Sequence, residues 1–513
     1  MNKELNISTT PAKNLITKGD VRDVLDLTYQ TYDKCWNTLI KFEGSKLDRD
    51  FFPELMNFQP MLCRGMLKLE KIFHSIAQEK RRLIARKKSL SIKWFKQRMK
   101  NLSDYQNAIE QCIWIGKSLG DAFVWIFYEN ERTLLAEHRK HKEICHLPVG
   151  IGGIGELAFI TQIKKLGDCY IIYHGITTIL RHGDISLFDL KRKKIVAIGD
   201  LKSKQEEKGV AKVRFVFTGL TPEDVEKINR SLQSSSTEGP SNSKKNDLLM
   251  DFPPPMREHL TNQLNQISSA LEQREKGPYF KKSGVFENHI KELNILYKNL
   301  KTGKFVYQAA SPSLLLLAYK YRKQSFPLKL IGRSHIDFPA KLKKIESGIS
   351  SIIDHSRNDN LLYYETFFYT KTGAVRNLPG TVPLFWWPLN KEFVREIIFQ
   401  EVFVFTFFNP RHFLIKLEAN GFTIEHDEGK NSFKVSKDIN GIMHVMQPFN
   451  HYFGLIMNNL LSEDAVIYML NDVYRTVGEH DFPRDEPYEI PINFEQSFAS
   501  PKDIGILKTK SAR

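Results

Sequence analysis

The sequence predicts an α/β protein that begins with a helical region and ends with an α+β domain. At 513 residues the chain is long enough for two or three domains. Apolar residues recur at steps of three and four through much of residues 1–145, which is typical of amphipathic helices. Runs rich in β-branched and aromatic residues crowd into residues 169–202 and indicate neighbouring strands. We therefore expect a helical region at 1–145, an α/β core at 146–325 and an α+β domain at 326–513.

The helical region is predicted to hold three long segments, at about residues 19–42, 61–99 and 120–146. The second segment carries ten Lys and Arg residues between positions 80 and 100, together with Trp94 and Phe95. Clustered basic residues fit contacts with phosphates, which give affinity without sequence information. A solvated helix face explains the same pattern equally well.

The composition favours a polyanionic partner. Lys and Arg outnumber Asp and Glu by 75 to 59, which gives a formal net charge of +16. Nucleic acid or an anionic membrane surface would match this charge, and solubility alone is the alternative. No apolar run approaches the roughly 18 residues of a membrane span, no signal peptide is recognised, and the five cysteines form no CxxC pair. We expect a cytoplasmic protein with no membrane partner.

The residues of greatest chemical interest lie between positions 150 and 204. Glu156 opens an apolar segment with helical spacing, Asp184 begins one β-like run, and Asp200 and Lys202 close the next. Residues two apart project from the same face of a strand, so Asp200 and Lys202 share a face. Leu201 points the other way, but its carbonyl lies beside the site. Three acids and a lysine delivered in this way are suited to hold a divalent cation and a water against a phosphate.

Two other patterns, a dinucleotide-binding motif and a possible metal site, are less well supported by the sequence. The letters GIGGIG at 150–155 match the dinucleotide-binding GxGxxG, but no buried strand precedes them and no acid ends the next strand. His138, His141 and Cys145 are spaced to share one face of a helix, but no fourth ligand stands at metal-binding spacing. A packed or solvated helix face is the preferred interpretation of the histidines.

A helix with an acid, a strand with an acid and a next strand ending in D-x-K resemble the PD-(D/E)XK nuclease superfamily. The resemblance covers residues 150–204 and extends to the helix and strands predicted within 286–320. It implies an αβββαβ core with a mixed sheet, like that of restriction endonucleases, and metal-dependent cleavage of phosphodiester bonds, usually in DNA. By match to the motif, Glu156, Asp184, Asp200 and Lys202 are the catalytic residues. The residue before Asp184 is Gly183, where the motif has proline.

The residue types suit this chemistry. Mg²⁺, or Mn²⁺ in its place, prefers hard oxygen ligands, which Asp184, Asp200 and the carbonyl of Leu201 would supply. The cation would lower the pKa of a bound water, and Lys202 would orient that water or stabilise the transition state. Glu156 would bind a second metal or hold a water.

We therefore expect a DNA endonuclease of restriction or phage-defence type. Whether it acts alone, as a homo-oligomer or with a partner subunit of a defence system is left open. The alternative is a nucleic-acid-binding or scaffold protein whose nuclease-like fold no longer cuts.

The rest of the chain is less informative. Residues 234–256 are rich in Ser, Lys and Pro and predict a disordered insertion. Strands near 305–307 and 314–319 are expected to return to the sheet of the α/β core. In the last region, residues 361–370 and 403–408 predict strands, and Trp386 and Trp387 are interpreted as core or interface packing in preference to base stacking.

Overall fold

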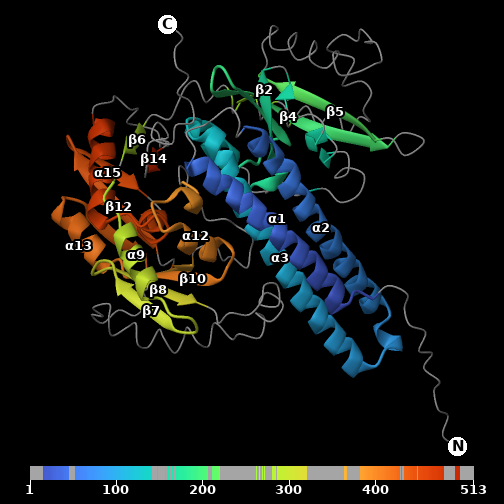
Figure 1. Cartoon of the computed structure of the whole chain (residues 1–513). Helices are drawn as coiled ribbons and strands as arrows, with labels where there is room; N and C mark the ends of the chain where they lie inside the picture. Colours follow the sequence, from blue (N-terminus) through green and yellow to red (C-terminus); the bar gives the residue numbers. More distant parts are fainter. Residues whose placement is uncertain are drawn as a thin grey trace, which may run out of the picture.

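The fold is that of a computed structural model of the whole chain (Figure 1). The structure describes residues 15–44, 52–140, 147, 156–157, 159–161, 165–166, 168–205, 211–219, 262, 265, 268–269, 271, 280–284, 286–320, 363–366, 382–427, 429, 432–446, 449–478 and 492–496. The predicted insertion at 234–256, the glycines at 150–155, and His141 and Cys145 lie outside these residues. Within the described residues, no helix combines the length and apolar character needed to span a bilayer.

The predicted N-terminal helical region is confirmed. Its helices are α1 (Lys18–Gly44), α2 (Phe52–Ala85), α3 (Ile92–Tyr128) and α4 (Arg132–Lys140), with a short 3-10 helix, η2 (Lys87–Ser89), between α2 and α3. The first three lie side by side as a long bundle (Figure 1). The segment predicted at 61–99 covers parts of α2 and α3, and the segment predicted at 120–146 covers the end of α3 and all of α4. The break falls where burial stops, because every residue from 84 to 89 is exposed.

The first sheet is antiparallel throughout. Its strands, in spatial order, are β1 (Lys165–Leu166), β2 (Cys169–Tyr173), β3 (Ile185–Asp189), β4 (Lys194–Gln205) and β5 (Ala211–Thr218). β2 and β3 are fully buried, as their apolar sequences require. β2 is shorter than the run expected at 169–180, because the chain turns at a 3-10 helix, η3 (His174–Ile176).

The expectation that later strands return to this sheet is wrong. A second antiparallel sheet has the order β7 (Phe305–Ala309), β8 (Leu314–Lys320), β10 (Val402–Phe408) and β9 (Tyr363–Thr366). The buried apolar strands β8, LLLLAYK, and β10, VFVFTFF, pair with each other at its centre. The mixed sheet of an αβββαβ core is therefore not seen among the described residues. The domain division at residue 325 stays a prediction, although the second sheet draws strands from both sides of it.

The C-terminal part adds smaller elements, and the chain as a whole is mixed α/β. A third antiparallel sheet is formed by β11 (Thr423–Asp427), β12 (Ser432–Ile439) and β13 (Ile442–Met446), and β6 (Phe280–Gly284) pairs in parallel with β14 (Ile492–Gln496). The remaining helical elements are α9 (Ile290–Asn299), η6 (Leu384–Trp386), α12 (Lys391–Ile398), α13 (Arg411–Ala419), η7 (Phe449–Tyr452), α14 (Phe453–Met457) and α15 (Glu463–Gly478).

The helical bundle packs against both other parts of the chain. Toward the first sheet, Gln59 on α2 donates its side-chain amide to the Ile171 carbonyl at 2.7 Å. Toward the C-terminal part, the Trp386 indole N–H donates to the Ala122 carbonyl of α3 at 2.9 Å. Trp386 and Trp387 are both buried, so their interpretation as packing residues is confirmed. One continuous hydrophobic core joins the bundle to both sheets.

Candidate acidic site

The structure brings Asp184 and Asp200 together on neighbouring strands. Asp184 immediately precedes β3 and Asp200 lies in β4, where Ile185 pairs with Gly199. The two side-chain carboxyls are hydrogen-bonded to each other. The backbone N–H of Leu201 donates to Asp184 Oδ2 at 2.7 Å, which fixes the orientation of that carboxyl. Asp200 is only 3% exposed, whereas Asp184 is half-buried, so solvent reaches the pair only from the Asp184 side.

The acid pair holds a proton at neutral pH. Burial, together with the hydrogen bond to Asp200 and its charge, raises the pKa of Asp184 to about 9, and the Leu201 N–H only partly offsets this. A hydrogen bond between two carboxyls needs a proton on one of them, so the pair as a unit retains a proton. The pair therefore offers two oxygen-rich groups with one proton between them, which a cation could replace.

Gly183 explains the departure from the motif's proline. Its φ of +65° lies in the left-handed region, whereas the proline ring fixes φ near −65°. A Cβ atom at this position would lie 2.6 Å from the Gly199 carbonyl oxygen. Glycine thus allows the chain to enter β3 in close contact with β4, immediately before the acid pair.

Glu156 acts on the acid pair through its charge, while its role as a metal or water ligand stays a prediction. Residues 156 and 157 are helical, and the Glu156 side chain is buried, with 7% exposed. Its carboxylate accepts a hydrogen bond from the Tyr173 hydroxyl at the end of β2. Burial and the neighbouring Glu156 charge raise the pKa of Tyr173, so the phenol keeps its proton and remains the donor. The charge of Glu156 also adds to the raised pKa of Asp184, which places the three acids in one electrostatic unit.

The other two predicted residues are described less fully. Lys202 lies on β4 two residues beyond Asp200 and pairs with Arg214 of β5, but its side chain lies outside the described part. Leu201 is buried, and its N–H donates to Asp184. That its carbonyl is a metal ligand stays a prediction. The described side chains contain no group of three or more His, Cys, Asp or Glu arranged to hold a metal. The acid pair itself still fits Mg²⁺ or Mn²⁺, since its oxygens are hard donors already in contact.

Helix α3 supports the site through buried charges that the sequence did not reveal. Lys117 donates to the carbonyls of Gly175 at 2.6 Å and Thr177 at 3.2 Å. Asp121 accepts from the backbone N–H and the hydroxyl of Thr178, both at 2.6 Å. Lys117 and Asp121 thus hold the turn at 174–178. This turn is joined to the acid pair, because the N–H of His174 donates to the Asp184 carbonyl at 2.8 Å. Two charged residues within the apolar stretch CIWIGKSLGDAFVWIFY are the signal that could have found them.

The histidines behind the site serve packing. His138 lies 5.5 Å from His174 and 5.3 Å from His182 between ring centroids, and its Nδ1 accepts the backbone N–H groups of Arg181 and His182. His174 contacts the Ser186 hydroxyl at 2.6 Å, and burial lowers its pKa to about 3, so it stays neutral. This agrees with the packed interpretation of His138.

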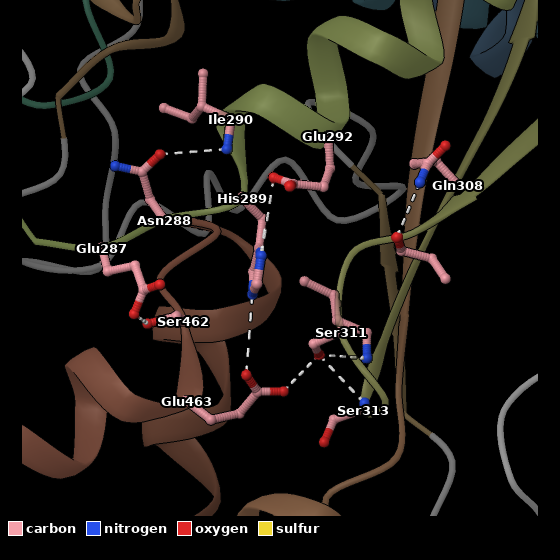
Figure 2. Close-up of polar contacts among 12 residues, drawn as sticks. Glu287, Asn288, His289, Ile290, Glu292, Gln308, Ser311, Ser313, Ser462 and Glu463 are labelled. Carbon is pink, nitrogen blue, oxygen red and sulfur yellow. Dashed lines mark hydrogen bonds and ion pairs between the residues drawn. The ribbon is translucent and has the colours of Figure 1, made fainter.

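A second polar cluster lies in the C-terminal part (Figure 2). Ser311 donates to Glu463 Oε1 at 2.5 Å, and His289 Nε2 lies 3.9 Å from Glu463 Oε2. The serine oxygen also accepts the N–H groups of Ser313 and Leu314. In a serine hydrolase the histidine contacts the serine, whereas here the glutamate separates them. The cluster instead ties the start of α15 to the β7–β8 turn and the residue before α9.

Glu463 carries the charge of this second cluster. Burial by itself would raise its pKa, but contacts with His289 and Ser311 and its own backbone N–H hold the pKa at about 2. The glutamate is therefore ionised at neutral pH.

No protein-family model, curated protein or solved structure matches the chain, so the acid pair and Glu156 carry the functional proposal.

Proposed function

We propose that the chain is a metal-dependent nuclease that hydrolyses phosphodiester bonds, with DNA as its substrate and restriction or phage defence as its role. The observation that carries the proposal is the acid pair, in which Asp184 at the start of β3 meets Asp200 of the adjacent strand β4 and feels the charge of Glu156. Lys202 follows Asp200 at the spacing of the PD-(D/E)XK motif, which this stretch resembles. The net charge of +16 further favours a polyanionic substrate.

Each residue has a distinct role in this proposal. Asp184 and Asp200 would hold Mg²⁺ or Mn²⁺, which would neutralise phosphate charge and make a nearby water more acidic. The Leu201 N–H orients Asp184, so that its carboxylate needs little rearrangement to become a ligand. Tyr173 orients Glu156, which holds a second cation or a water. Lys202 places a compact positive charge next to the phosphate.

The direct test is incubation of purified protein with plasmid DNA, linear DNA and RNA in Mg²⁺, Mn²⁺ or EDTA. We expect cleavage of DNA with either metal and none in EDTA. Asp200→Asn should lower the cleavage rate by at least about a hundredfold, because it removes an anionic ligand and leaves the volume unchanged. Asp23→Asn, an exposed carboxylate of α1, is the matched control and should cut as wild type does. Equal cleavage by a folded Asp200→Asn protein would refute the proposal.

The alternative is a protein that binds nucleic acid without cutting it. It is favoured because the Tyr173 hydroxyl already occupies the Glu156 carboxylate. Among the described side chains, no third acid is arranged as a metal ligand. Tight binding of DNA with no product in any metal would select this alternative. The wild-type protein and Asp200→Asn would then bind DNA equally.

A further inference from the structure

Four basic residues follow the acid pair along the hairpin that β4 forms with β5. β3 is paired with β4 only as far as Gly199, whereas β5 is paired with β4 to the last residue of β4. In the described part of the sheet, the two strands therefore continue together past the acid pair (Figure 1). There Lys202 lies opposite Arg214, and Lys204 lies opposite Lys212. These four residues are here named the basic ribbon.

The basic ribbon lies on the face of the sheet that carries the acid pair. Positions two apart on a strand share a face, and so do positions directly opposite on neighbouring strands. Lys202 and Lys204 are two and four residues beyond Asp200 on β4, so they and their opposite positions on β5 share the face of Asp200. At about 3.3 Å per residue, the two lysines lie about 7 Å and about 13 Å from Asp200 along the strand. The basic ribbon thus begins at the acid pair and extends away from it.

The sequence of β5 separates its two faces. In AKVRFVFT, Lys212 and Arg214 alternate with Ala211, Val213 and Phe215. An antiparallel strand with this alternation has one apolar face and one polar face. The cations of β5 are therefore confined to the face that carries the acid pair.

The charges of the basic ribbon are unfavourable for the protein alone. Like charges at directly opposite positions destabilise an antiparallel pair, and here two such pairs are neighbours on one face. Residues 202–214 hold five cations and two acids, Glu206 and Glu207, which lie outside the described residues. Lysines also keep strand edges from pairing, but a lysine opposite a neutral or acidic residue would do this equally well. The paired cations therefore indicate a polyanion that lies across both strands.

We propose that the basic ribbon binds the phosphates of the nucleic-acid strand that is cut at the acid pair. This rests on the proposed function, because the reaction identifies the strand. A strand that is held at the acid pair must continue past it, and the basic ribbon continues from the acid pair on the same face. An anionic membrane surface would also attract four cations, but only a substrate strand must occupy the acid pair as well.

The first test is a binding titration in EDTA at several salt concentrations, with a DNA duplex of about three helical turns. Lys204→Gln/Lys212→Gln removes one cross-strand pair of cations and leaves Lys202 in place. It should weaken binding about tenfold and flatten the salt slope by about two units. Lys204→Arg/Lys212→Arg keeps the charge and should bind as wild type does. The matched control, Lys298→Gln/Lys301→Gln, removes the same charge from exposed positions near the end of α9 and should leave binding nearly unchanged.

Two further measurements separate a binding role from a structural one. In single-turnover cleavage with Mg²⁺, the glutamine variant of the basic ribbon should need about tenfold more DNA to reach half its maximal rate. At saturating DNA it should cut at the wild-type rate, because Asp184, Asp200 and Lys202 are unchanged. In urea without DNA its unfolding midpoint should be no lower than that of wild type, since a pair of like charges has been removed. A lower midpoint would show that the lysines serve the fold and would overturn the proposal.

The remaining outcomes separate this proposal from the nuclease proposal. If wild type cuts DNA and the glutamine variant binds and cuts as the control does, the role of the basic ribbon is overturned and the nuclease stands. The role is also overturned if the variant binds DNA normally but loses binding to vesicles of phosphatidylcholine and phosphatidylserine. If the variant binds DNA more weakly but wild type cuts nothing in Mg²⁺ or Mn²⁺, the nuclease proposal fails and the basic ribbon remains a nucleic-acid contact.

Discussion

The pH dependence of folding offers a strong test of the acid pair. Asp184 keeps its proton in the folded protein up to about pH 9, whereas in the unfolded chain it releases the proton near the ordinary value of 3.8. A carboxyl whose folded pKa is raised loses stability as pH rises through this window, because the unfolded chain gives up its proton first. Asp200→Asn replaces the partner by an amide that donates to Asp184, so the variant no longer needs the shared proton.

The magnitude follows from the width of the window. One retained proton changes the free energy of unfolding by up to about 1.4 kcal/mol per pH unit, so the loss between pH 5 and pH 8 is at most about 4 kcal/mol. Asp200→Asn should remove the part of this loss that comes from the Asp200 carboxyl, although burial of Asp184 remains, and should be more stable than wild type at pH 8. At pH 5 the two proteins should be nearly equal.

The assay is urea unfolding in EDTA at pH 5, 6, 7 and 8, with Asp23→Asn as the control. Asp23 is an exposed carboxyl on α1, so its variant should follow wild type at every pH. The informative quantity is the difference between Asp200→Asn and wild type, since other titrating groups cancel in it. A difference that stays constant from pH 5 to pH 8 would refute the shared proton.

Three further substitutions test the supporting structure. Glu463→Gln should lower the free energy of unfolding by up to about 3 kcal/mol at pH 7, because a depressed carboxyl pKa stabilises the fold above about pH 4.5 and that contribution is lost as pH falls toward 2. An equal cost at pH 7 and pH 3 in urea unfolding would contradict this. Lys117→Met should lower the free energy of unfolding by about 3–5 kcal/mol, since it leaves two buried carbonyls and Asp121 without their cation. Lys93→Met, at the exposed start of α3, should change it by no more than about 0.5 kcal/mol. Equal stabilities of the two variants in urea unfolding would show that Lys117 does not hold the turn at 174–178. Gly183→Ala should lower the free energy of unfolding by about 2 kcal/mol more than Gly441→Ala, because both positions have positive φ but only a Cβ at position 183 meets a backbone oxygen. Matched melting temperatures of the two variants would contradict the close approach of Gly183 to Gly199.

The contact between Asp184 and Asp200 was predictable because it is local. β3 and β4 follow each other with only a short turn between them, so antiparallel pairing places the start of one beside the end of the other. The long helices were predictable for the same reason, since their periodicity extends over many residues. The helix break at 86–91 was missed because the basic residues there are compatible with a helix.

Partners distant in the sequence could not be predicted. The apolar run at 314–320 suits any buried strand position, and only packing selects β10, from residues 402–408, as its neighbour. Lys117 and Asp121 look like interruptions of an apolar helix until their partners on the turn at 174–178 are known. The contact of His289 with Glu463 likewise joins segments that no local pattern connects.

Proton release on metal binding tests the acid pair most directly. Metal-free protein would be titrated with Mn²⁺ in weak buffer at pH 7.5, with a pH indicator reporting the protons released. We predict about one proton per bound ion, because a cation held by Asp184 and Asp200 must displace the proton that they share. Asp200→Asn should bind Mn²⁺ more weakly and release none. Binding without proton release, or equal release from the variant, would contradict the assignment of this pair as the metal site.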